Sequence, residues 1–159
     1  MRRTLVKLGA VGLAAGVTFT GAAQAAEASS QKHADASVQY RKALFQLIRS
    51  NMAPLGGMAK GAIPYDAEVM GTNALRLEQL AAMVGDYMKT DTRKFDVDTD
   101  AKDEVWDNFA DVEKKAMALG DAAKGLQTVV AAGDESAYRA AIGKIGSTCK
   151  SCHDDYKKD

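Results

Sequence analysis

Apolar residues return every three or four positions in four stretches of this chain, which is the spacing of one buried face of an α-helix. The stretches cover about residues 35–52, a segment that begins near Asp66, residues 103–133, and a last segment that ends near Lys157. No segment alternates apolar and polar residues over the length of a strand. The pattern therefore predicts four helices and no strands.

Three polar or glycine-rich segments separate these predicted helices. The first runs from Pro54 to Pro64 and contains three glycines, and prolines and glycines end helices or favour turns. A charged loop runs from Lys89 to Asp100, and Gly133 precedes the last helix. Because the first and third connections are short, each joins antiparallel neighbours. We predict an all-α fold, an antiparallel four-helix bundle with up-down-up-down order.

Residues 1–25 have the parts of a secretory signal peptide. Three basic residues precede an apolar run over residues 8–19, and Ala23-Gln24-Ala25 fits the small-x-small cleavage rule. We predict cleavage before Ala26, or one residue later. The apolar run is shorter than the roughly 20 residues that span a membrane. We therefore expect export to the periplasm of a Gram-negative bacterium, with no membrane segment after cleavage and a single domain over residues 26–159.

The charge of the chain argues against nucleic acid as a partner. The precursor contains 21 basic and 21 acidic residues. The predicted signal peptide contains three charged residues, all of them basic. Removal of the signal peptide therefore leaves a net charge of −3. A protein that binds nucleic acid needs a basic surface, which this composition does not favour.

The chemistry of the chain is concentrated in Cys149-Lys150-Ser151-Cys152-His153. This stretch holds both cysteines and one of the two histidines, and Cys-x-x-Cys-His is the attachment sequence of c-type haem. On a helix, residues three and four apart lie on one face. Both thiols can therefore bond the edge of the ring while His153 reaches its iron. We predict one covalent haem c per chain, held by Cys149 and Cys152, with His153 as a ligand of the metal.

Other uses of paired cysteines fit this sequence less well. A thioredoxin-like pair requires a preceding strand and a helix N-terminus, and the pattern offers neither. A zinc site needs four ligands, and only His33 and carboxylates could complete one. A disulfide across two residues of a helix is strained. These alternatives together amount to one competing hypothesis, a helical-bundle protein without haem that has a thiol-disulfide or a structural role.

The position of the motif narrows the class of cytochrome. Only six residues follow His153, and none is Met or His, so any sixth ligand of the iron comes from upstream. The chain resembles cytochrome c′, of the class II c-type cytochromes, over essentially its whole length after the signal peptide. The resemblance rests on Val38-Gln39-Tyr40-Arg41, Ile63-Pro64-Tyr65-Asp66-Ala67, Glu104-Val105-Trp106 and Cys149-Lys150-Ser151-Cys152-His153-Asp154-Asp155-Tyr156.

The resemblance implies a four-helix bundle around haem c, often a homodimer packed through its first two helices. It implies a five-coordinate, high-spin iron with His153 as the sole axial protein ligand. An apolar side chain of the first helix would cover the opposite, distal face. By position this side chain is Phe45, or Leu44 if the register shifts by one residue.

The resemblance also implies polar contacts to the edge of the haem. Arg41 and Lys42 match first-helix residues near the haem propionates, and a guanidinium can pair a carboxylate through two hydrogen bonds. Asp100 matches a loop position that can approach the haem. Lys157 departs from the family, because many members carry Arg after the Tyr. An ammonium group cannot stack on the imidazole as a guanidinium can.

The expected function is electron transfer with redox partner proteins, binding of NO or CO, or both. Phe45 would offer bound dioxygen no hydrogen bond. The alternative is a six-coordinate low-spin electron-transfer cytochrome, whose relatives use a Met of the first helix. No Met lies between Ser30 and Asn51, and His33 is expected in a polar segment before that helix. The sequence shows no positioned general base and no phosphate loop, so we expect no enzymatic activity.

Overall fold

The computed structural model of the chain describes residues 25–158, so the predicted signal peptide lies outside the described residues except for Ala25. The described elements are β1 (Ala26–Glu27), α1 (Gln31–Ala59), α2 (Ala67–Met88), β2 (Thr90–Asp91), α3 (Glu104–Asp107), α4 (Phe109–Ala131), a 3₁₀ turn (Glu135–Ala137) and α5 (Tyr138–Tyr156).

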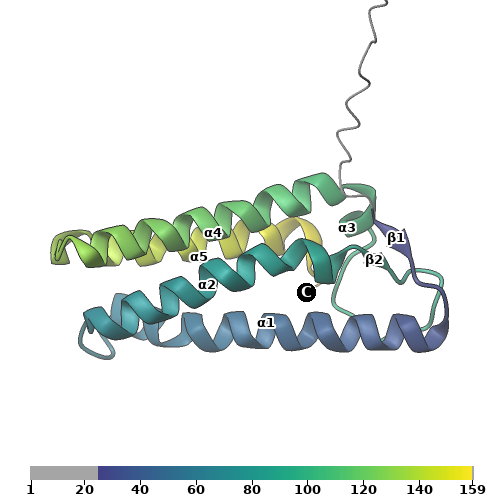
Figure 1. The fold of residues 1–159 in the computed structure, drawn as a ribbon, viewed down its shortest axis with the longest axis horizontal. Coiled ribbons are helices and arrows are strands. Elements are labelled where there is room, and N and C mark those ends of the chain that lie inside the picture. Colours follow the sequence, from purple (N-terminus) through teal and green to yellow (C-terminus); the bar gives the residue numbers. More distant parts are fainter. Residues whose placement is uncertain (1–24, 159) are drawn as a thin grey trace, which may run out of the picture.

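Four long helices form the body of the molecule (Figure 1). Each runs antiparallel to the one before it, and α1 contacts α2, α2 contacts α4, α4 contacts α5, and α5 contacts α1. This ring of contacts confirms the predicted up-down-up-down bundle. The C-terminal end of α5 lies at the end of the bundle that also holds α3 and the two strands (Figure 1). The haem-attachment motif is therefore at that end.

The core lies between the four long helices. Every long helix contributes side chains that are less than 2% exposed, among them Leu55, Met70, Leu77, Leu126, Ile142 and Ile145. The spacing of these residues is the helical period seen in the sequence. Across residues 25–158, no helix has both the length and the apolar character needed to cross a membrane.

Helix α1 is longer at both ends than predicted. It begins at Gln31 rather than near residue 35, because the Ser30 hydroxyl accepts a hydrogen bond from the backbone N–H of His33 at 3.2 Å. His33 therefore lies in the first turn of the helix, not before it. The helix also passes through Pro54 and ends at Ala59. The prediction of a break at Pro54 was wrong because the following turns bury Leu55 and Met58 in the core.

The third predicted helix is divided into α3 and α4. Asn108 between them has φ −124° and ψ 39°, which no α-helix accommodates. The prediction of no strands was also wrong, although only by a two-residue pair. Strand β1 runs parallel to β2 and joins the N-terminal segment to the loop after α2. Two residues are too few to produce an alternating pattern in the sequence.

Candidate haem-binding site

The last turns of α5 carry the attachment motif on the face that packs against the bundle. Tyr138, Ile142 and Ile145 are buried earlier on this face, and Cys149 and Cys152 continue it as partly buried side chains against the core. Both thiols are free, and burial raises the pKa of each above its ordinary value. The two sulfur atoms are thus held at the edge of the core, as the predicted periodicity requires.

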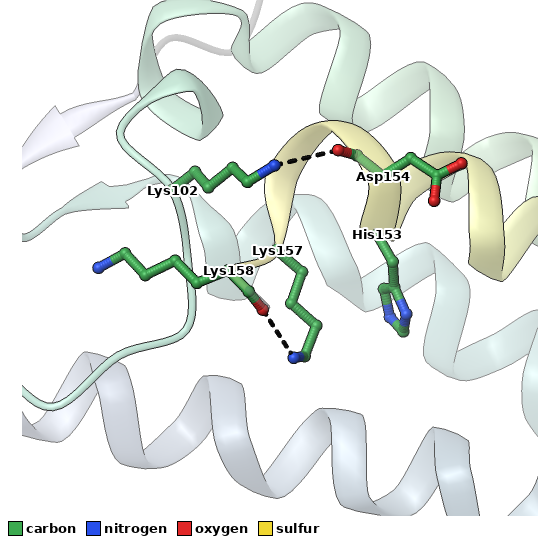
Figure 2. Close-up of a pocket in the computed structure, with 5 residues that line it drawn as sticks. All are labelled: Lys102, His153, Asp154, Lys157 and Lys158. Atoms are coloured by element: carbon green, nitrogen blue, oxygen red, sulfur yellow. Dashed lines mark hydrogen bonds between the residues drawn. The ribbon is translucent and has the colours of Figure 1, made fainter.

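His153 follows on the same helix and is exposed. Among the hydrogen bonds of residues 25–158, none involves its imidazole ring, so both ring nitrogens are available for other partners. The ring lines a pocket of about 390 Å³ together with Lys102, Asp154, Lys157 and Lys158. Figure 2 shows the His153 ring and the Lys157 side chain projecting to the same side of α5, whereas the Asp154 carboxylate points away.

The charged loop before α3 closes the end of α5. The backbone N–H of Lys158 donates to the carbonyl oxygen of Asp100 at 2.8 Å, and Lys157 Nζ lies 3.8 Å from the Asp100 carboxylate. From the same loop, Lys102 Nζ donates to the carbonyl oxygen of Asp154 at 3.0 Å (Figure 2). Asp100 therefore lies beside the last turn of α5 and is close in space to the attachment motif, although 49 residues separate it from Cys149 in the sequence.

Arg41 of α1 is a buried cation with an incomplete set of partners. Only 4% of the residue is exposed. Its Nε donates to the carbonyl oxygen of Ser37 at 3.3 Å, and its Nη2 donates to Thr92 Oγ1 at 3.1 Å. The guanidinium also lies over the ring of Trp106, 5.3 Å from its centroid. In residues 25–158, Arg41 Nη1 is the single buried side-chain nitrogen or oxygen without a hydrogen-bond partner.

The electrostatic state of Arg41 follows from these surroundings. Burial lowers its pKa from the ordinary value, and the negative charge of Asp91 acts in the opposite direction. A buried polar atom without a partner is costly, more so when it belongs to a charged group. The arrangement therefore suits an anionic group that can accept a hydrogen bond from Nη1.

The other predicted residues of α1 have different environments. Lys42 forms an exposed ion pair with Asp98, 2.7 Å between Nζ and Oδ2. Leu44 is buried in the core at 4% exposure, whereas Phe45 is 37% exposed. Phe45 follows Arg41 by four residues, so the two side chains lie on one face of the helix. Leu44 is packed in the core, whereas Phe45 is left partly exposed one turn from Arg41.

Sequence reasoning missed the residues that hold Arg41. Thr92 is fully buried although it belongs to a polar loop, and no local pattern marks it. Trp106 entered the sequence argument only through the family resemblance. Trp106 is the only tryptophan of the chain, and it follows Val105 at the start of the third predicted helix. This was the one signal in the sequence that pointed to a structural role.

Lys115 of α4 anchors the segment that contains the attachment motif. Its Nζ lies 2.9 Å from an Asp155 carboxylate oxygen, and it donates to Ser151 Oγ at 2.9 Å. Nearby, the Tyr156 hydroxyl donates to Asp111 Oδ2 at 2.8 Å. Burial, followed by this hydrogen bond, raises the pKa of Tyr156 to about 12. These contacts tie the last turns of α5 to α4.

The residues present fit a covalently attached haem. The donor set contains two free thiols three residues apart, an imidazole without a hydrogen bond in the described part of the chain, and a buried guanidinium nitrogen that lacks an acceptor. Thiols suit thioether attachment, imidazole suits iron, and the guanidinium suits a propionate. The fold and the site together define a c-type cytochrome built on a four-helix bundle.

Comparison with known proteins names the family within this class. The family model described as cytochrome c′ matches residues 36–157, and the chain belongs to that family. A cytochrome c′ of Cereibacter sphaeroides is 37% identical over 135 residues, which cover 84% of this chain and 88% of the relative. The protein is accordingly a haem c protein, with two cysteines available for covalent attachment.

Solved structures of the family have the same fold. Cytochrome c prime from Shewanella frigidimarina matches with a TM-score of 0.71 and 32% identity, covering 79% of this chain and 97% of that chain. A ferrous variant of cytochrome c prime from Alcaligenes xylosoxidans with bound NO matches with a TM-score of 0.69 and 32% identity, covering 79% and 96%.

Proposed function

We propose that this protein binds NO or CO, and exchanges electrons with redox partner proteins, at a five-coordinate high-spin haem iron whose sole axial protein ligand is His153. Haem iron, when bound, supplies a one-electron redox centre and an open coordination position. The protein's residues attach the ring, ligate one side of the iron and control access to the other side. We assign the chain no catalytic turnover.

Attachment and ligation are proposed for the three residues of the motif. Cys149 and Cys152 hold the ring through thioether bonds, and His153 ligates the iron. The two cysteines lie partly buried against the core, and the His153 ring lines the pocket at the end of α5, which supports this assignment. The NO-bound relative supports a small diatomic molecule as the ligand of the iron.

Arg41 is proposed to pair with a haem propionate. The support is its buried Nη1, which lacks an acceptor among residues 25–158. A bidentate pair with a carboxylate would complete its hydrogen bonds and offset the cost of burial. Lys42 and Asp100 remain proposed contacts of the haem edge. Lys42 can reach a propionate only in competition with Asp98, its partner in an exposed ion pair.

One observation carries the proposal of a five-coordinate iron. The face of α1 that holds Arg41 presents Phe45 one turn further on, and a phenyl ring cannot ligate a metal. The next thioether on this helix is Met52, seven residues or about 10 Å along the axis from Phe45. Met58 is only 3% exposed and belongs to the core. The side of the iron opposite His153 is therefore left to external ligands, which Phe45 selects by size.

A visible absorption spectrum of the protein isolated from the periplasm tests this proposal. We expect a high-spin ferrous spectrum without added ligand, and haem that stays with the protein on acid-acetone extraction. The Phe45→Met substitution should convert the spectrum to low-spin, because it places a thioether on the open side of the iron. The matched variant Leu44→Met should leave the spectrum unchanged, since Leu44 faces the core.

Three results would contradict the proposal. Sharp, split α and β bands in the unmodified protein without ligand indicate a six-coordinate low-spin cytochrome. Extraction of all haem by acid-acetone indicates that no covalent bond forms. Conversion to low-spin in Leu44→Met but not in Phe45→Met indicates that Leu44, and not Phe45, lies on the open side of the iron.

Export to the periplasm is proposed from the sequence of residues 1–25 and agrees with the fold. The backbone N–H of Ala26 donates to the carbonyl oxygen of Lys89 at 2.9 Å as strand β1 begins. Cleavage before Ala26 would turn this group into an ammonium that can make the same bond. N-terminal sequencing of the periplasmic protein tests the cleavage site, and a first residue beyond Glu27 would contradict it.

A homodimer packed through α1 and α2 is proposed from their exposed apolar residues. Tyr40 and Leu47 on α1 are 59% and 53% exposed, and Leu75 and Met83 on α2 are 46% and 38% exposed. Each pair is seven or eight residues apart and so shares a helix face. Sedimentation equilibrium should give a dimer mass that Leu47→Lys reduces toward the monomer. A monomer mass for the unmodified protein would contradict the proposal.

A further inference from the structure

The ring of Trp106 lies beneath two guanidinium groups. Arg41 Cζ is 5.3 Å and Arg93 Cζ is 5.7 Å from the ring centroid. The indole N–H of Trp106 donates to the carbonyl oxygen of Met88 at 3.0 Å, which fixes the ring at the end of α2. Two like charges are thus brought to one aromatic ring, close to the candidate propionate site.

The two arginines differ in the charge of their partners. Arg93 is held by carboxylates: its Nε and Nη2 bond both oxygens of Asp91 at 2.8–3.1 Å, and its Nη1 bonds Asp107 at 2.6 Å. Arg41 is held by neutral groups only, the Ser37 carbonyl and the Thr92 hydroxyl. Its Nη1 has no partner among residues 25–158.

Asp91 is the carboxylate that could satisfy Arg41 instead. It precedes Thr92, the loop residue bonded to Arg41, and its charge acts on the Arg41 guanidinium. Burial tends to raise the pKa of Asp91, but hydrogen bonds from the side chain and backbone of Arg93 outweigh this effect and lower it. Asp91 is therefore an anion, and both of its carboxylate oxygens already accept hydrogen bonds from Arg93.

We propose that Arg93 is a positioning residue for the haem site, which keeps Asp91 from pairing with Arg41 and so leaves Arg41 Nη1 for a haem propionate. The inference rests on the proposed propionate role of Arg41. A bidentate carboxylate partner is among the strongest that a guanidinium can find, so an unoccupied Asp91 would compete directly with the propionate. Arg93 prevents that competition without itself contacting the haem.

The midpoint potential of the haem-containing protein, measured by spectroelectrochemistry, tests this inference. In Arg93→Gln, Asp91 is free to pair with Arg41, the propionate loses its cation, and the ferric form is favoured. We therefore expect the potential to fall. The matched control is Lys94→Gln, which removes the same charge from the adjacent residue. Lys94 pairs with Glu27 at 2.7 Å and takes no part in the stack, so its substitution should cause a clearly smaller fall.

A double-mutant cycle with Arg41→Gln separates positioning from long-range charge. If Arg93 acts through Arg41, then Arg93→Gln in the Arg41→Gln background should change the potential no more than Lys94→Gln does. In the Arg93→Gln background, Asp91→Asn should raise the potential more with Arg41 intact than in the presence of Arg41→Gln, whereas a distant charge effect would raise it equally in both.

Two outcomes would overturn the inference, and they differ in what else they overturn. If Arg93→Gln lowers the potential equally with and without Arg41, Arg93 acts only as a distant charge. The propionate role of Arg41 then still stands, provided that Arg41→Gln alone lowers the potential. If Arg41→Gln alone leaves the potential unchanged, the propionate contact is wrong and the role of Arg93 is wrong with it.

Discussion

The Trp106→Phe substitution should destabilise the protein more than its conservative chemistry suggests. Met88 is the last residue of α2, so its carbonyl oxygen has no partner within the helix. The indole N–H of Trp106 supplies that partner at 3.0 Å, and the side chain is buried at 7% exposure. Phenylalanine keeps an aromatic face but has no N–H.

The expected loss is about 1–4 kcal/mol in the free energy of unfolding. A buried carbonyl left without a hydrogen bond costs about 1–3 kcal/mol. The weaker attraction of Phe for the guanidiniums of Arg41 and Arg93 adds up to about 1 kcal/mol. Both losses fall at the haem-bearing end of the bundle.

Guanidinium chloride unfolding of the haem-containing protein measures this loss. The midpoint should fall while the dependence on denaturant concentration stays constant, because the surface exposed on unfolding is unchanged. Tyr65→Phe, at a residue 39% exposed, is an aromatic control expected within about 0.5 kcal/mol of the unmodified protein. A loss for Trp106→Phe no larger than that of the control would refute the capping role of the indole.

Three further substitutions test other parts of the structure. Because the folded pKa of Tyr156 is about 12 against an ordinary value of 10, its stabilising effect is complete below about pH 10 and is lost as pH rises toward 12. Denaturation against pH should show this loss, and Tyr156→Phe should not. Pro54→Ala should raise the free energy of unfolding by about 1–3 kcal/mol, and the thermal midpoint with it, because α1 continues through a residue that cannot donate a hydrogen bond; a lower midpoint would contradict this. Lys115→Gln should lower the thermal midpoint slightly, and less in high salt, since it removes the ion pair with Asp155; a salt-independent loss would contradict it.

The sequence predicted the helices because their stability comes from a periodic apolar face, and that period can be recognised within a short stretch of the sequence. The end of α1 shows the limit of this reasoning. Pro54 is a reliable local signal for a break, but burial of Leu55 and Met58 outweighs the one missing hydrogen bond. Local propensity and tertiary packing disagreed there, and packing prevailed.

The candidate site likewise has one part that the local sequence predicts and one part that it does not. The spacing within the attachment motif is a local feature, so the sequence alone placed Cys149 and His153 on one helix face. The surroundings of Arg41 depend on Thr92 and Trp106, which lie 51 and more residues away in the chain. No pattern within a window of the sequence brings them together. Only the closed bundle does so, through the loop between α2 and α3.

That loop joins the two halves of the site. Toward α1 it supplies the Thr92 hydroxyl to Arg41, the residue proposed to hold a haem propionate. Toward α5 it supplies Asp100, whose carbonyl oxygen accepts from Lys158 just beyond the attachment motif. One segment therefore sets both the position of the cation that would hold a propionate and the position of the helix end that carries His153. A change in the length of the loop between these contacts must displace one half relative to the other, whereas the same change in the connection before Ala67, at the opposite end of the bundle (Figure 1), leaves both halves in place.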